Sequence, residues 1–258
     1  MAPNVFWKLV HHEFHWSGNR RKSKRKLSGK WWAAHIIFVI LLGFFILTMF
    51  SGSKGFNLQN LWFFSLGLPF AIFFIGYGTV KKEWDNETQG WWLSLPYSRS
   101  FITGAKLLGS LLQTWLVLVG VYLLAVVYGL YMIAVDSHLA ITDLGAFLLT
   151  GFAWIFTLVI FSPLILALGM SLSLVVYTEY RPVTPILWVV YMGAGSFFYW
   201  GYGNVNKMQN FYRLFTGEVA ATWFPFPFYI YGLAVIGWVF TYLIVRYLGG
   251  LLEKKLAL

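Results

Sequence analysis

One polar segment of the chain, residues 81–106, carries side chains that could do chemistry. It lies between two apolar blocks and holds three tryptophans, a proline and charges of both signs. Its candidate contact residues are Glu83, Trp84, Glu87, Trp91, Trp92 and Arg99. Exposed tryptophans anchor protein interfaces, and charged groups set the register between two partners. The segment is therefore either a docking surface or an interfacial helix without a partner, and periodicity alone does not separate these hypotheses.

Other kinds of chemistry find little support in the sequence. The five histidines form no H-E-x-x-H pair, and no G-x-S-x-G elbow or G-x-x-x-x-G-K-[ST] phosphate loop occurs. His11, His12 and His15 could bind a metal adventitiously, but the face of an interfacial helix explains them better. With no cysteine in the chain, disulfides and thiol catalysis are excluded. We therefore expect no catalytic site, no metal site and no cofactor in this chain.

The composition is that of a membrane protein. Of 258 residues, 59% are hydrophobic and 11% are charged, and the mean hydropathy is +0.68. A soluble domain carries about 25% charged residues. Long apolar runs that do not alternate exclude a membrane β-barrel. The sequence predicts an all-α polytopic membrane protein that forms a single transmembrane domain over residues 1–258.

Six apolar stretches are long enough to cross a bilayer, which takes about 20 residues. They are Trp32–Phe50, Leu61–Val80, Leu107–Met132, Leu144–Tyr177, Pro185–Trp200 and Pro227–Leu248. The fourth is too long for one straight crossing, so we expect it to tilt, kink at Pro163 or extend past one face. Recurring small residues, such as Gly76 and Gly78, would allow helices to approach closely.

Two further segments are predicted to lie at the membrane surface. In residues 1–30, Phe6, Leu9, Val10 and Phe14 give one apolar face, with Glu13 and basic residues off it, and a basic run follows. This pattern indicates an interfacial helix near anionic headgroups, although a plain positive anchor would explain it as well. Residues 201–226 are rich in aromatics, and we expect short interfacial or re-entrant outer helices there rather than a disordered loop.

The positions of the basic residues predict the orientation. With the N-terminus inside, sixteen of the 19 lysines and arginines fall in inner segments, and only Lys54, Lys207 and Arg213 fall in outer ones. The positive-inside rule then places both termini and residues 81–106 in the cytoplasm. The net charge of +10 is explained by this placement, so we expect no nucleic-acid partner.

The predicted spans lack the groups that drive ion-coupled transport. No Asp, Glu, Lys or Arg occurs in residues 31–53, 55–80, 107–135, 144–178 or 182–206. His35 lies near the inner end of the first span and is best interpreted as an interfacial anchor. Since ion-coupled carriers place ionisable groups in the bilayer, the energy source is expected to lie outside this chain.

Residues 81–95 are predicted to form a short helix parallel to the membrane. Trp84, Trp91 and Leu95 share one face at helical spacing, and Gly90 could divide the helix into two pieces. Pro96 disfavours helical geometry at Leu95. Ser98 or Ser100 could cap the next helix, which carries Lys106 into the third span.

This segment resembles the membrane subunits of ABC transporters of the ABC-2 (type-2 exporter) permease family. These permeases carry, after the second span, Glu, then Gly, then Leu-x-x-Pro-x-Ser-Arg, a hydrophobic residue and Lys. The matching residues here are Glu83, Glu87, Gly90, Leu93, Pro96, Ser98, Arg99, Ile102 and Lys106. Residues 6–14 also resemble the family's interfacial entry helix. The Thr88-Gln89-Gly90 order and the Trp91-Trp92 pair depart from the family's pattern.

The resemblance implies that the segment is a coupling helix that docks into a separate ATPase subunit. It implies docking roles for Glu83, Trp84, Glu87, Gly90, Trp91, Trp92, Pro96 and Arg99. ATP and Mg²⁺ would bind the partner ATPase, and a second permease copy or a paralogue would complete the pathway. The expected location is the cytoplasmic membrane of a bacterium.

Two functions of different classes follow from these observations. The first is the permease subunit of an ATP-driven exporter that moves an amphipathic or hydrophobic compound, such as a peptide, a lipid-linked molecule or an antibiotic. The second is a membrane binding or immunity protein that sequesters an amphipathic ligand without ATP. The sequence leaves the substrate open, and also whether the partner permease is identical.

Overall fold

A computed structural model describes residues 3–15, 57–136, 138–200, 211–218 and 228–254, with Thr222 and separate positions between 34 and 48. The predicted first span, Trp32–Phe50, and most of residues 201–226 lie outside these ranges. The described chain is a helical bundle without strands, as predicted. Its elements are α1 Pro3–His15, η2 Leu58–Gly67, α3 Leu68–Asp85, α4 Gln89–Ser94, α5 Arg99–Val135, α6 Ile141–Val175, η3 Arg181–Val183, α7 Thr184–Trp200, α8 Phe211–Phe215 and α9 Phe228–Lys254.

Four helical segments are long and apolar enough to cross a membrane: Leu58–Asp85, Arg99–Val135, Ile141–Val175 and Tyr231–Glu253. They correspond to the second, third, fourth and sixth predicted spans. The fifth corresponds to α7, whose 17 residues stand at the lower limit for a spanning helix. At a rise of 1.5 Å per residue, α5 and α6 are each more than about 50 Å long and extend beyond the hydrocarbon layer.

Glycines allow a close contact between helices α3 and α6. A Cβ atom at Gly76 would stand 2.3 Å from the backbone oxygen of Leu166, and one at Gly169 would stand 2.2 Å from that of Phe73. No larger residue fits at either position, which confirms the expected close approach. At Gly67 and Gly78 a Cβ would meet nothing within 4 Å, so these glycines do not serve that purpose.

Helix α6 continues through Pro163, which is buried in its middle. Proline lacks an N–H, so the carbonyl of Val159 loses its helical donor. The Ser162 hydroxyl donates to that carbonyl at 2.7 Å, and the Trp115 indole of α5 donates to the Ser162 oxygen at 3.0 Å. A neighbouring hydroxyl thus satisfies the freed carbonyl inside an apolar bundle.

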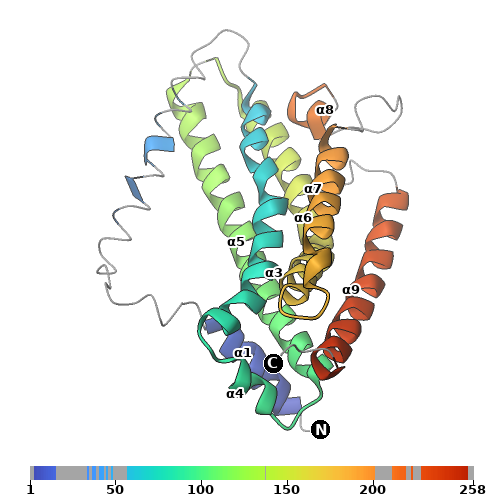
Figure 1. Ribbon diagram of the computed structural model, residues 1–258. Coiled ribbons are helices and arrows are strands. Elements are labelled where there is room, and N and C mark those ends of the chain that lie inside the picture. The colour runs from blue at the N-terminus through green and yellow to red at the C-terminus, as the bar shows by residue number, and fades with distance from the viewer. Residues whose placement is uncertain are drawn as a thin grey trace.

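The short elements collect at opposite ends of the bundle (Figure 1). Helices α1 and α4 lie at one end, together with the end of α9, and α8 lies at the other. Helix α8 packs on η2 through Phe215, whose ring stands 5.3 Å from that of Phe63, and the Asn57 amide donates to the Thr216 carbonyl at 3.2 Å. Within the described part of residues 201–226 there is thus a packed helix, as predicted.

Candidate functional site

The end of the bundle that carries α1 and α4 contains a buried ion cluster, formed by Glu13, Lys82, Glu83 and Lys106. Lys106, in the second turn of α5, is only 2% exposed. Its ammonium pairs with the carboxylates of Glu13 from α1 and of Glu83 from α3, the latter at 2.5 Å. Since an unpaired buried charge is strongly unfavourable, this lysine depends on both acids, and it joins three helices at one point.

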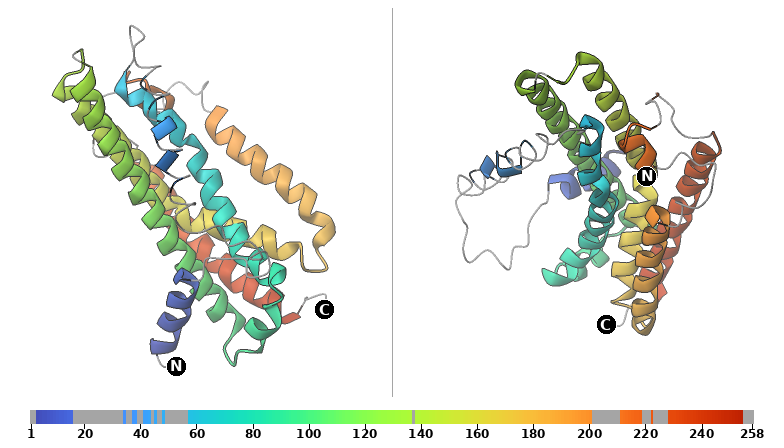
Figure 2. Two further views of the ribbon diagram at one scale, coloured as in Figure 1. Left: turned by 90° about the vertical axis from the view of Figure 1, so that its left-hand side faces the viewer. Right: turned by 90° about the horizontal axis from the view of Figure 1, so that it is seen from above.

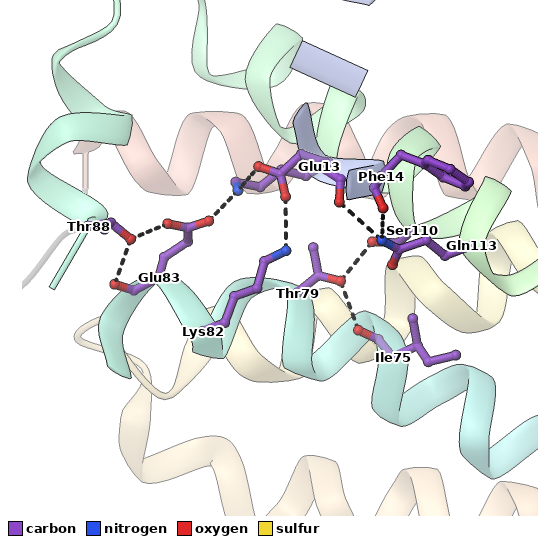
Figure 3. A network of polar contacts seen from close by, with 10 residues as sticks. Glu13, Phe14, Ile75, Thr79, Lys82, Glu83, Thr88, Ser110 and Gln113 are labelled. Atoms are coloured by element: carbon purple, nitrogen blue, oxygen red, sulfur yellow. Dashed lines mark hydrogen bonds and ion pairs between the residues drawn. The ribbon is translucent and has the colours of Figure 1, made fainter. Parts of the chain in front are cut away.

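Lys82 balances the charge of the cluster. Its ammonium lies 3.1 Å from the second carboxylate oxygen of Glu13 (Figure 3), so that two acids face two bases. Burial alone would raise the pKa of Glu13, but the charges of Lys106 and Lys82 and their hydrogen bonds outweigh that effect. The pKa of Glu13 is therefore lower than its ordinary value of 4.5, and the carboxylate stays ionised.

Glu83 extends the cluster to the connection between α3 and α4. The Thr88 hydroxyl donates to its carboxylate at 2.5 Å (Figure 3), and the Thr88 backbone N–H donates to its carbonyl at 2.9 Å. Between them, Glu87 takes a left-handed conformation with φ of 57°. The chain therefore turns at Glu87. The prediction of a helix from Lys81 that divides at Gly90 was wrong, because α3 runs on to Asp85 and a capped turn follows it.

Helix α4 lies against the cluster through its aromatic side. Trp92 is 3% exposed, and the Lys106 ammonium stands 5.1 Å from its ring centroid, within the range of a cation–π contact. Trp84 stacks on Tyr177 with ring centroids 4.4 Å apart and meets Trp92 edge-on at 6.2 Å. The helix ends at Ser94 and Leu95 is extended, as expected before Pro96.

Ser98 is the N-cap residue of α5, as predicted, but its side chain makes no capping hydrogen bond.

Helix α1 packs tightly on the start of α5 (Figure 2). A Cβ at Gly109 would stand 2.7 Å from the Glu13 Cβ, so only glycine allows this approach. The Gln113 amide donates to the carbonyls of Glu13 and Phe14, at 3.1 and 2.6 Å, near the C-terminal end of α1 where helix carbonyls lack partners. Glu13, which was predicted to lie off the apolar face of residues 1–30, is instead buried on the side of α1 that packs on α5.

The predicted docking residues divide into two groups. Glu83 and Trp92 lie in the interior and Trp84 packs on Tyr177, so the idea of one contact face formed by the tryptophans and Arg99 is corrected. The other group is formed by Glu87, Gly90 and Pro96, which are exposed, and by Arg99, which is half-buried. Trp91 belongs to α4.

Sequence reasoning missed the ion cluster around Glu83 and the contact of Gln113 with α1 beside it. Glu13, Lys82 and Gln113 were not singled out, and Lys106 was noted only as the last residue of a motif. A signal existed, since Phe6, Val10 and Glu13 follow i, i+4, i+7 spacing and so share a face. An acid on the packing face of one helix requires a base on its neighbour.

The arrangement holds helices α1, α3 and α5 in place. In the described parts of the chain no group of three or more His, Asp or Glu side chains could hold a metal ion. The four charged groups satisfy one another, which suits a rigid joint between α1, α3, α4 and α5.

Comparison with known proteins identifies a family of membrane proteins. The sequence model of a family described as ABC-2 family transporter protein matches residues 25–246, which include α3, α4 and α5 but not α1. Searches of curated proteins and of solved structures find no match.

Proposed function

The chain is a member of the ABC-2 family of transporter proteins, and from this premise we propose that it is the permease subunit of an ATP-driven exporter. Its ATPase would be a separate protein that binds α4 from the cytoplasm. The substrate would be an amphipathic or hydrophobic compound taken from the cytoplasm or the inner leaflet. A second permease copy or a paralogue would complete the pathway.

The observation that carries the proposal is the placement of α4. This short helix stands between two membrane-length helices at the end of the bundle (Figure 1), with one side fixed and the other open. Trp92 and the Glu83–Thr88 contact fix its inner side to the ion cluster. Because α4 is anchored rigidly to α3 and α5, a movement of a bound partner would be transmitted through α4 to both helices.

The open side of α4 suits a protein partner. Gly90 of α4 and the flanking residues Glu87 and Pro96 are exposed, and they offer a partner a charge, a position without a side chain and a rigid turn. The glycine would let a partner approach the backbone closely. Charges of opposite sign on the partner would set the register against Glu87 and Arg99. We therefore assign docking to this surface and anchoring to Glu83 and Trp92.

Co-purification tests the proposal. The chain is co-expressed with an ABC-type ATPase from the same genome, and variants Glu87→Arg and Arg99→Glu are compared with the parent. Either change is expected to lower the amount of bound ATPase at least about tenfold, as a lost interface anchor does. Glu218→Arg is the matched control, because it reverses an exposed acid near α8, at the opposite end.

Two results would contradict the proposal. If both variants bind the ATPase and support ATP hydrolysis as the parent does, α4 and its flanking residues are not the docking surface. If no ATPase binds and the chain still protects cells from an amphipathic compound, the ATP-independent binding protein is the correct reading.

A further inference from the structure

A crevice lies between α6, α7 and α9, in the half of the bundle nearest α1 and α4. Its volume is about 380 Å³, within the range of small-ligand sites. Tyrosines contribute much of its lining, and the side chains used below are Tyr180, Ser171, Leu187, Tyr191, Ile244 and Tyr247. None of them belongs to the ion cluster or to the proposed docking surface.

The packing of α7 leaves this space open. Trp188 of α7 contacts a group of aromatic rings on α3, with centroids 5.9 Å from Phe73, 6.1 Å from Phe74 and 5.9 Å from Tyr77. These contacts hold α7 on the α3 side. On the side towards α9, the small Ser171 of α6 does not fill the gap, and the crevice remains.

The deep part of the crevice presents acceptor oxygens. The Ser171 hydroxyl donates to the Leu168 carbonyl at 2.7 Å, so its only proton is used. In the 3.3 Å contact between Ser171 and Tyr191, the tyrosine must therefore be the donor. Both oxygens keep lone pairs, and the remaining lining there is aliphatic.

The mouth of the crevice presents hydroxyl donors, and an exposed arginine is adjacent to one of them in the chain. Tyr180 and Tyr247 are 42% and 63% exposed, and no hydrogen bond to either hydroxyl is found among the described residues. Arg181 is also exposed and follows Tyr180 directly. Phenol and guanidinium groups bind carboxylate or phosphate oxygens, so the mouth suits an anionic headgroup.

We propose that this crevice binds a single-chain anionic amphipath, a fatty acid or a lysophospholipid, from the leaflet on the side of α1 and α4. The alkyl chain would lie along Leu187 and Ile244, and the headgroup would meet Tyr180, Arg181 and Tyr247. The helices that line the crevice belong to a membrane bundle, so acyl chains are the solvent at its opening. The proposal needs only the membrane location and is independent of ATPase docking.

Photolabelling of the purified chain in phosphatidylcholine nanodiscs tests the site. The probe is palmitate with a diazirine on its chain, and labelled peptides are mapped by mass spectrometry. Label is expected in residues 168–191 and 244–251. Unlabelled palmitate or palmitoyl lysophosphatidylglycerol should remove it, and the stronger competitor identifies the carboxylate or the phosphate as the preferred headgroup.

Three variants sharpen the test. Arg181→Gln should lower labelling by the anionic probe about fivefold, as expected for the loss of one basic residue at a membrane surface. Labelling by a lysophosphatidylcholine probe should stay unchanged. Ser171→Trp should abolish labelling by filling the crevice. Tyr247→Phe keeps the ring of an exposed residue, so it tests the hydroxyl without risk to folding, and it should weaken binding about threefold.

A second crevice supplies the matched control. It has about 420 Å³ and an almost wholly apolar lining that includes Ile160, Val235 and Trp238. Val235→Trp there should leave palmitate labelling unchanged. The proposal is overturned if label spreads evenly over lipid-facing residues such as Leu124 and Val239, if neither competitor displaces it, or if Ser171→Trp and Arg181→Gln label as the parent does.

Discussion

At the scale of single residues, Lys106 is the charge on which the others depend. It is almost fully buried, and two carboxylates reach it from α1 and α3. A buried ion pair adds little stability compared with a well-packed apolar pair, but removing one partner costs much, because the remaining charge has no water to solvate it. We therefore expect Lys106 to determine which helices pack together, and to add little to the net free energy of unfolding.

Replacing Lys106 tests this dependence. Lys106→Met should destabilise the protein by about 3–5 kcal/mol, because Glu83 loses its lysine and Glu13 keeps only Lys82. Thermal unfolding of the purified protein in detergent measures the effect. Adding Glu83→Gln to Lys106→Met should recover part of the loss, since one orphaned charge is removed.

Lys81→Met is the control for this prediction, because it removes an equal charge from an exposed neighbour of the cluster. It should change stability by less than about 1 kcal/mol. The interpretation of the cluster is wrong if Lys106→Met unfolds at the same temperature as Lys81→Met.

At the scale of elements, α1 belongs to the bundle through its fit to α5. Val10 and Glu13 face α5 at the position of Gly109, and Gln113 holds the last carbonyls of α1. An amphipathic helix bound only by headgroups would need none of these contacts. This packing places α1 where a movement of α5 or α4 would reach it.

A pair of glycine variants on α5 tests the fit of α1. In Gly109→Ala the new methyl would stand 2.7 Å from the Glu13 Cβ, so α1 must shift, and its backbone amides should exchange hydrogen at least about tenfold faster. Gly120→Ala meets nothing within 4 Å and should stabilise α5 by about 0.5–1 kcal/mol. Equal exchange of residues 3–15 in both variants would show that α1 is not packed as described.

The sequence predicts the structure best where one local signal decides the outcome. Apolar length alone located α3, α5, α6 and α9, and Pro96 ended α4 where expected. Agreement fails where two distant segments act on each other. Glu83 was expected to contact a partner protein, but its carboxylate points inward and pairs with Lys106. The chain turns at Glu87 rather than at Gly90, because Thr88 hydrogen-bonds to Glu83.

At the scale of the whole molecule, the distribution of basic residues and the arrangement of the short helices indicate the same orientation in the membrane. The basic segments expected in the cytoplasm include α1 and the connection from α3 to α5, and these elements lie at one end of the bundle (Figure 1). The helix α8, from the segment expected outside, lies at the other end. The proposed docking surface and the anionic amphipath site would then both face the cytoplasmic side.

The absence of cysteine makes this orientation directly testable, because the parent gives no background with thiol reagents. Four exposed positions are changed one at a time: Ser94, His138, Arg181 and Glu218. A membrane-impermeant maleimide should label His138→Cys and Glu218→Cys in intact cells. It should label Ser94→Cys and Arg181→Cys only after permeabilisation, because α5, α6 and α7 each carry the chain across.

Labelling of Ser94→Cys in intact cells would remove α4 from the reach of any cytoplasmic ATPase and would overturn the proposed function together with the orientation. Labelling of Arg181→Cys and Glu218→Cys from the same side would instead show that α7 does not cross, and would leave the docking surface untouched.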